Sequence, residues 1–347
     1  MRSLSSFFVG CVSGIIVGQI IFPAFKIGTD YGIVGARSFC DERLLDEGIT
    51  RCNCDGSLNV QPANHTPLQV VLPASIAKGE QHLLPANPSK QPDKLTFTEI
   101  LKESGSDKYY RHHFEQYYEK WLEPFRSKFD LTMLELGARD GRSMQLWDKY
   151  FEHPKVILGL AYGSYSENVE RTTQILTHVQ IFRGDQSEPN TMAHLRDKGP
   201  WDIIIDDASH VPQHQVYSLF HLWQSVKPGG IYVIEDLETN YWRDGTRIYD
   251  YTLKSTGIGA APNASAVSKL EQIQQVLMRH QIGARNLTVM PGDDRICSME
   301  WGMNLVVLRK CELNIELPPY QEPQYDQSRM QSWIRNAKST NPSLDMQ

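Results

Sequence analysis

Short apolar segments alternate with helix-length segments through the middle of the chain. Five of them are rich in Ile, Leu and Val and almost continuously hydrophobic: residues 131–137, 155–161, 178–185, 201–207 and 229–236. Strands of this kind are typical of a parallel sheet with helices on both faces. Between the last two segments, apolar side chains recur at helical spacing and predict an amphipathic helix: Val216, Leu219, Phe220, Trp223 and Val226.

Two further strands are predicted at 286–290 and 303–309, after a helix around Val267 to His280. The whole pattern predicts a doubly wound α/β domain with a mostly parallel, seven-stranded sheet. Ligands of such sheets bind beyond the carboxyl ends of the strands. A functional site is therefore expected in the loops that follow the strands.

The chain has 347 residues, and the regions outside the domain differ from it in composition. Residues 1–26 have no charged side chain between Arg2 and Lys26. As a helix, this uncharged segment is long enough to cross a bilayer, and it predicts a signal anchor. A cleaved signal peptide is the alternative. Glycines at 10, 14 and 18 form a small-residue stripe that would allow helix pairing and a homo-oligomer. Residues 27–94 predict a Pro-rich stem, 95–316 the globular domain, and 317–347 a polar tail.

Glycosylation motifs and cysteines suggest where the domain resides. Three Asn-x-Ser/Thr sequences follow the predicted anchor, beginning at Asn64, Asn263 and Asn286. Cysteines cluster in the stem (Cys40, Cys52, Cys54) and near the end of the domain (Cys297, Cys311). Disulfides, one in the stem and one clamping the last strands, are favoured over a zinc site, which would need a second chelating pair. These features predict a single-pass type II glycoprotein of the Golgi membrane with a lumenal domain.

The charge balance excludes one class of partner. The chain has 35 Lys and Arg residues against 41 Asp and Glu residues, so its formal net charge is −6. Nucleic-acid binding requires a basic surface that neutralises phosphates. A nucleic-acid partner is therefore not expected.

The loop after the first strand contains Glu135, Gly137, Gly141 and Ser143 in a tight turn that opens a helix. The two glycines would let the backbone approach a ligand closely. The loop lacks both the G-x-G-x-x-G pattern and the Gly-Lys-Ser/Thr of a phosphate loop. A dinucleotide or a nucleoside triphosphate is therefore disfavoured.

Acidic residues follow two neighbouring strands. Asp206, Asp207 and His210 end one strand, and Glu235 and Asp236 end the next. Carboxylates brought together at adjacent strand ends repel each other unless a cation lies among them, and oxygen ligands favour Mg²⁺, Mn²⁺ or Ca²⁺. His210 is placed to act as a general base. The alternative is that these acids only cap helices or bind loop backbone.

These motifs resemble the metal-dependent sugar O-methyltransferases that act on macrolide sugars, together with rhamnosyl O-methyltransferases and cephalosporin-hydroxylase-like proteins. The resemblance is carried by residues 201–242 (with DD-x-SH and PGG-x-YVIED), and extends to 104–126, 134–147 and 183–189. It implies a class I S-adenosylmethionine-dependent methyltransferase. The implied cofactor residues are Glu135, Gly137, Gly141, Ser143 and Asp206, with Asp185 and Gln186 near the adenine. The implied Mg²⁺ (or Mn²⁺) ligands are Asp207, Glu235 and Asp236, and His210 would take the hydroxyl proton.

The chain departs from the family at the end of the second strand. The family usually has an acidic residue there, in a G-x-D pattern, on the ribose hydroxyls of the cofactor. This chain has Gly159-Leu160-Ala161. Loss of a charge-assisted hydrogen bond would cost about 1.5 to 3 kcal/mol of cofactor affinity.

The predicted function is methyl transfer from S-adenosylmethionine to a sugar hydroxyl of a glycan or glycoconjugate, by a membrane-anchored enzyme facing a lumen. Two alternatives remain open from the sequence. One is a non-haem iron oxygenase that uses the same carboxylates and His210, although the usual H-x-D/E order is reversed here. The other is an inactive glycan-binding protein that kept the fold.

Overall fold

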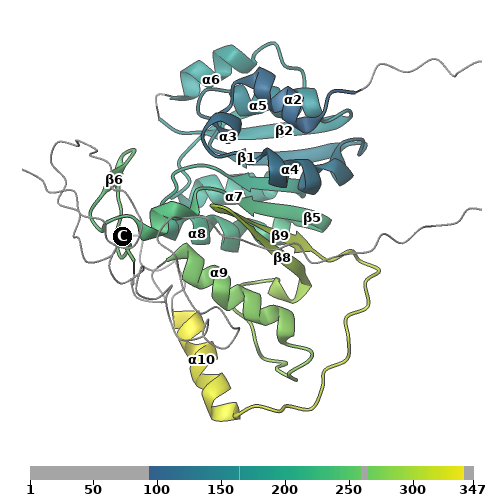
Figure 1. Cartoon of the computed structure of the whole chain (residues 1–347), viewed down its shortest axis with the longest axis vertical. Helices are drawn as coiled ribbons and strands as arrows, with labels where there is room; N and C mark the ends of the chain where they lie inside the picture. Colours follow the sequence, from purple (N-terminus) through teal and green to yellow (C-terminus); the bar gives the residue numbers. More distant parts are fainter. Residues whose placement is uncertain (1–93, 164, 259–264, 340–347) are drawn as a thin grey trace, which may run out of the picture. The chain divides into compact units, whose positions relative to one another are not determined.

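The computed structural model describes residues 94–163, 165–258 and 265–339. Within this part the chain forms a seven-stranded sheet with the order β3-β2-β1-β4-β5-β9-β8 (Figure 1). The strands are β1 (Leu131–Leu136), β2 (Pro154–Ala161), β3 (Val179–Arg183), β4 (Trp201–Asp206), β5 (Val226–Ile234), β8 (Ile296–Gly302) and β9 (Leu305–Lys310). The first five pair in parallel, and β9 is antiparallel to both β5 and β8. The predicted doubly wound, mostly parallel sheet is confirmed.

Helices cover both faces of the sheet because successive strand residues point to opposite sides. Leu134 and Leu136 of β1 pack in one hydrophobic cluster, and Met133 packs in the other. The first cluster contains residues of α7 (Pro189–Lys198), α8 (Pro212–Leu222) and α9 (Ala266–Gln275). The second contains residues of α2 (Phe97–Ser104), α4 (Glu115–Leu122), α5 (Arg142–Tyr150) and α6 (Tyr165–Thr173). A one-turn helix, α3 (Asp107–Tyr110), lies between α2 and α4 in the chain.

The predicted strand at 286–290 is wrong. Leu287 and Val289 are buried, which explains the apolar pattern, but the backbone turns there. The Asp293 carboxylate accepts hydrogen bonds from the backbone N–H groups of Val289 (2.6 Å) and Met290 (3.0 Å), so these donors do not enter a sheet. The strand next to β9 is instead β8, which begins at Ile296.

The packed core continues beyond residue 316, into the segment predicted as a tail. Helix α10 (Gln327–Ser339) buries Ile334 and Ala337 in the same cluster as α9, and Lys269 of α9 donates to the Ala337 carbonyl at 2.7 Å. Cys297 and Cys311 form a disulfide with their Cα atoms 4.9 Å apart, which links β8 to the residue after β9. The predicted stem cysteines lie outside the described residues.

The predicted anchor at 1–26 and nearly all of the predicted stem also lie outside the described residues. Among the residues that are described, no helix combines the length and the apolar character needed to span a bilayer. Asn64 and Asn263 fall outside the described ranges, and Asn286 is exposed.

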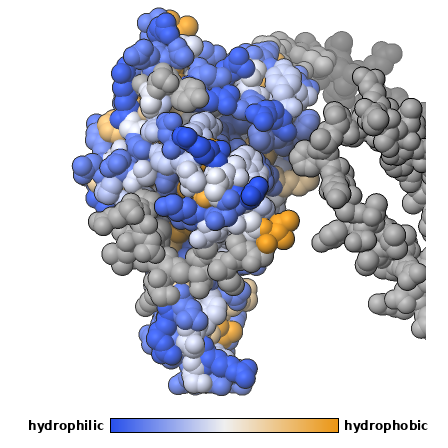
Figure 2. All heavy atoms as spheres, turned by 90° about the vertical axis from the view of Figure 1, so that its left-hand side faces the viewer, coloured by the Kyte–Doolittle hydropathy of each residue, from blue (hydrophilic) through white to orange (hydrophobic). Residues whose placement is uncertain are grey.

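A small hairpin of β6 (Arg247–Ile248) and β7 (Tyr251–Thr252) lies at the side of the sheet where the parallel strands end (Figure 1). It follows a 3-10 turn, η4 (Leu237–Tyr241), that comes directly after β5. Figure 2 looks at this side of the molecule and shows a mainly hydrophilic surface with scattered hydrophobic patches. The hairpin therefore lies over the edge where a ligand site is expected.

Candidate active site

A pocket of about 490 Å³ lies at the carboxyl ends of the strands. Its wall comes from residues 105–112, from the loops after β1, β2, β4 and β5, and from the β6–β7 hairpin. This volume is in the range of small-molecule and cofactor sites. Seven of the predicted site residues line it: Gly137, Ser143, Gln186, Asp207, His210, Glu235 and Asp236. The other four, Glu135, Gly141, Asp185 and Asp206, are not part of its lining.

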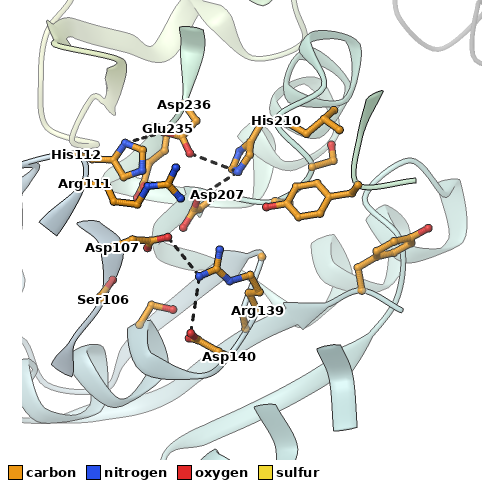
Figure 3. Close-up of a pocket in the computed structure, with 18 of the residues that line it drawn as sticks. Ser106, Asp107, Arg111, His112, Arg139, Asp140, Asp207, His210, Glu235 and Asp236 are labelled. Carbon is orange, nitrogen blue, oxygen red and sulfur yellow. Dashed lines mark ion pairs between the residues drawn. The ribbon is translucent and has the colours of Figure 1, made fainter. Parts of the chain in front are cut away.

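Asp207, His210 and Asp236 form a group whose potential ligand atoms all lie within 4.8 Å of one another. His210 Nε2 lies 3.4 Å from Asp236 Oδ2 and 3.9 Å from Asp207 Oδ1 (Figure 3). On the other side, His112 Nδ1 lies 3.3 Å from Asp236 Oδ1. Burial, aided by the charge of Asp207, raises the pKa of Asp236 to about 8. Two close carboxylates and an imidazole are suitable ligands for a divalent cation. A bound cation would balance the negative charge that, in its absence, favours the protonated form of Asp236.

The backbone around this group adopts conformations that need support. His210 (φ 55°) and Asp236 (φ 54°) both lie in the left-handed region, which is uncommon for residues other than glycine. The Thr239 hydroxyl donates to the His210 carbonyl at 2.6 Å. Asn304, in the turn between β8 and β9, donates its side-chain amide to Asp236 Oδ1 at 3.0 Å. These contacts hold both side chains toward the pocket.

Lys108 of α3 is a site residue that the sequence analysis missed. Its Nζ lies 2.5 Å from Asp207 Oδ2, 2.7 Å from Glu235 Oε1 and 3.4 Å from Glu135 Oε1, in a position that is 1% exposed. Burial disfavours the ammonium, but the charges of Asp207, Glu235 and Glu135 outweigh it and raise the pKa of Lys108 well above its usual range. The sequence offered one indication of its role: Lys108 lies within residues 104–126, which resemble the family. The hydrophobic pattern gave no other indication, because it does not predict that a lysine is buried.

Glu235 has buried partners that the sequence did not predict. Its carboxylate accepts hydrogen bonds from Lys108 Nζ and from the Tyr118 hydroxyl. It is not part of the three-residue group of Asp207, His210 and Asp236. Lys108 supplies a positive charge beside Glu235 that the predicted ligand set did not include.

The first loop is built differently from expectation. A Cβ on Gly137 (φ 106°) would lie 1.9 Å from the Asp207 carbonyl oxygen, and one on Gly141 (φ 81°) would lie 2.4 Å from Thr172 Oγ1. Both glycines are therefore required by packing within the protein. Glu135 is fully buried and accepts hydrogen bonds from Ser143 Oγ (2.6 Å) and Trp147 Nε1 (3.2 Å).

Gln186, which lines the pocket, forms a buried polar network with Asp206. Gln186 Nε2 donates to both oxygens of Asp206 at 2.7 and 2.8 Å, and Gln186 Oε1 accepts from the Ser209 backbone N–H at 3.1 Å. This network fixes the loop that carries His210. Asp185 accepts hydrogen bonds from the backbone N–H and the hydroxyl of Ser187, both at 2.7 Å, which stabilise the turn before α7.

Comparison with curated proteins gives relatives over part of the chain. An 8-demethyl-8-α-L-rhamnosyl tetracenomycin-C 2′-O-methyltransferase from Streptomyces olivaceus is 36% identical over 154 residues, which is 42% of this chain and 39% of that protein. The demethylmacrocin O-methyltransferase of Streptomyces fradiae is 37% identical over 164 residues, or 44% of this chain and 38% of that protein. The chain thus spans about two fifths of the length of these relatives. No protein-family model matches the chain.

A solved structure gives the fold. The MycE methyltransferase of the mycinamycin biosynthetic pathway, in complex with Mg and S-adenosylhomocysteine (SAH), superposes with a TM-score of 0.54 at 23% identity. The superposition covers 69% of this chain and 60% of MycE. At this identity the likeness establishes the fold.

The relatives also correct the predicted location. Both curated relatives are Streptomyces proteins, and no helix among the described residues could span a bilayer, which contradicts the predicted location in a Golgi membrane. The fold and the relatives confirm the resemblance found in the sequence: the chain has the class I methyltransferase fold and is related to the O-methyltransferases of macrolide and tetracenomycin sugars.

Proposed function

We propose that this chain is an S-adenosylmethionine-dependent O-methyltransferase that uses Mg²⁺ or Mn²⁺ to methylate a sugar hydroxyl of a glycoside or glycoconjugate. The observation that carries the proposal is the group of Asp207, His210 and Asp236, with ligand atoms within 4.8 Å, at the edge of the pocket. The names of the curated relatives support the choice of a sugar acceptor.

Asp207 and Asp236 would hold the cation. The chemistry that a bound cation supplies is acidification of the sugar hydroxyl, whose own pKa is far above neutral. His210 would accept the hydroxyl proton: burial lowers its pKa, so the imidazole is neutral and has a free nitrogen lone pair. Glu235 would act one step away, by fixing the Lys108 ammonium that holds Asp207.

The cofactor would lie along Gly137, Ser143 and Gln186, which line the pocket beside this group. The methyl group for the transfer comes from this cofactor. Glu135 would position Ser143 through their 2.6 Å hydrogen bond, and Asp206 would orient Gln186. Gly141 would serve the packing of the same loop against Thr172.

Two measurements test the proposal. Calorimetry should detect S-adenosylmethionine binding to the purified full chain, with a ligand-to-protein ratio of one. Methyl-labelled S-adenosylmethionine should then transfer label to phenyl α-L-rhamnoside in the presence of Mg²⁺. A matched pair of variants locates the site: Asp236→Asn should lose the transfer, whereas Asp244→Asn, an exposed acid outside the pocket lining, should keep it. A folded protein that does not bind S-adenosylmethionine would refute the proposal.

A further inference from the structure

The end of β2 lacks the acid that the sequence resemblance leads one to expect. Ala161 is the last residue of β2 and is 1% exposed, so its methyl group offers a ribose no hydrogen-bond acceptor. The neighbouring residues Leu160 and Tyr162 line the pocket at this point. Any acceptor for a ligand hydroxyl here must come from another side chain.

Tyr162 and Asp250 provide one. The Tyr162 hydroxyl donates to Asp250 Oδ2 at 3.1 Å, across 88 residues of sequence. Asp250 lies in the turn between β6 and β7, and its neighbours Tyr249 and Tyr251 line the pocket. The rings of Tyr162 and Tyr251 are 5.9 Å apart, so the hairpin packs directly against the end of β2.

The proton arrangement leaves the Tyr162 oxygen available. Its own hydrogen goes to Asp250. Tyr251 is within hydrogen-bonding reach of both Tyr162 and Asp185. Burial raises the pKa of Tyr162, whereas the hydrogen bond from Tyr251 acts to lower it, so Tyr162 is one acceptor of the Tyr251 proton, and the Asp185 carboxylate is the other and stronger one. A ligand hydroxyl that donates to the Tyr162 oxygen therefore competes only with Tyr251, which can turn its single proton to Asp185, and donation from Tyr162 to a carboxylate strengthens its oxygen as an acceptor.

The geometry points to Tyr162, positioned and polarised by Asp250, as the residue that accepts a hydrogen bond from the ribose hydroxyls of the cofactor in place of the absent β2 acid. This inference rests on the proposed function, since it concerns the same cofactor. Tyr162 would be the binding residue, and Asp250 would act through it as a positioning residue. The hairpin would thus make the pocket specific for a ribose.

The test measures preference for ribose hydroxyls by calorimetry, with SAH and its 2′,3′-dideoxy analogue as the two ligands. The wild type should prefer SAH, and Tyr162→Phe should weaken SAH binding roughly 10-fold with no change for the analogue. Asp250→Asn should weaken SAH in the same way but less, about 3- to 10-fold. The double variant should be no worse than Tyr162→Phe, because the two residues act as one unit. Asp244→Asn, in the same loop region, is the matched control and should leave both affinities unchanged.

Rescue provides a second arm. Ala161→Asp in the Tyr162→Phe background should restore much of the SAH affinity by returning a carboxylate to the strand end. Circular dichroism and thermal unfolding report whether each variant is folded, and Tyr162→Phe, which removes one oxygen, decides the question if Ala161→Asp does not fold. A folded Tyr162→Phe variant that keeps the full preference for SAH overturns the inference while the proposed function stands. A wild type that binds neither ligand refutes the proposed function and this inference with it.

Discussion

Lys108 Nζ lies 2.7 Å from Glu235 Oε1, and both side chains are buried beneath the pocket. The contact joins helix α3, before the sheet, to the end of β5, 127 residues later. Lys108 also touches Asp207 and Glu135, so one ammonium contacts three carboxyl groups from three strand ends. The protein therefore carries a fixed cation of its own beside the group expected to bind Mg²⁺.

Lys108→Met should destabilise the fold by about 3 to 5 kcal/mol, because it leaves buried carboxylates without a counter-charge. Millimolar Mg²⁺ should recover part of that loss, since a divalent cation would balance the same carboxylates. Urea unfolding with and without Mg²⁺ measures both effects.

The control for this prediction is Lys149→Met, which removes an exposed ion pair with Glu103 and should change stability by less than about 1 kcal/mol. A Lys108→Met protein as stable as the wild type would show that the buried ammonium is not needed.

Asn304 supports Asp236 from the turn between β8 and β9, and its own φ is 72°. Asn304→Gly should weaken Mg²⁺ binding by about 10-fold, because the amide that orients the Asp236 carboxylate is lost while glycine tolerates the backbone. S-adenosylmethionine affinity should not change. Titration of each ligand by calorimetry checks both statements.

Asn304→Ala serves as the comparison, since it removes the same amide and adds about 1 to 2 kcal/mol of backbone strain. Equal Mg²⁺ affinities of Asn304→Gly and wild type would mean that Asp236 is oriented by other contacts.

His214 is buried beside Tyr251, and its Nδ1 lies 2.9 Å from Ser209 Oγ. Burial lowers the pKa of His214 to about 4. Between pH 6.5, the ordinary histidine pKa, and pH 4, the His214 side chain binds a proton in the unfolded chain but not in the folded one. The contribution of His214 to the free energy of unfolding should therefore be full above pH 6.5 and smaller by about 3 kcal/mol at pH 4. Buried carboxylates with a raised pKa, Asp236 among them, contribute with the opposite sign over the same range, so the effect of His214 is read as a difference in urea unfolding: between pH 6.5 and 4 the wild type should lose more stability than His214→Gln. The exposed His153→Gln should lose as much as the wild type, and an equal loss in all three proteins would exclude His214 as the cause.

The sheet could be predicted from the sequence because its strands carry their own signal. Each of the five parallel strands is an apolar run long enough to be recognised alone, and the acids of the site directly follow two of them. The segment at 286–290 carries the same signal but turns, because Asp293, bound to Arg279 at 2.7 Å, captures its backbone donors. A local pattern cannot reveal such a competing partner.

The rest of the site depends on contacts between segments that lie far apart in the sequence. Three pairs each join two segments that only the folded sheet brings together: Lys108 with Glu235, Asn304 with Asp236, and Tyr162 with Asp250. The sequence pointed to Glu235 as a metal ligand but could not show that Lys108 is its buried partner. It pointed to close approach of a ligand at the two glycines of the first loop but could not show that Asp207 and Thr172 also leave no room for a side chain there.

In the proposed mechanism, a divalent cation at Asp207 and Asp236 and a proton acceptor at His210 act together in methyl transfer. The most direct test compares wild type, Asp236→Asn and His210→Ala in transfer to phenyl α-L-rhamnoside, with Mg²⁺ and after chelation, alongside Mg²⁺ and cofactor titrations. Chelation should abolish transfer by the wild type, and excess Mg²⁺ should partly restore Asp236→Asn. His210→Ala should still bind Mg²⁺ and S-adenosylmethionine while turnover falls roughly 10²- to 10⁴-fold at any Mg²⁺ concentration. Full transfer after chelation, or full activity of His210→Ala, would refute this mechanism.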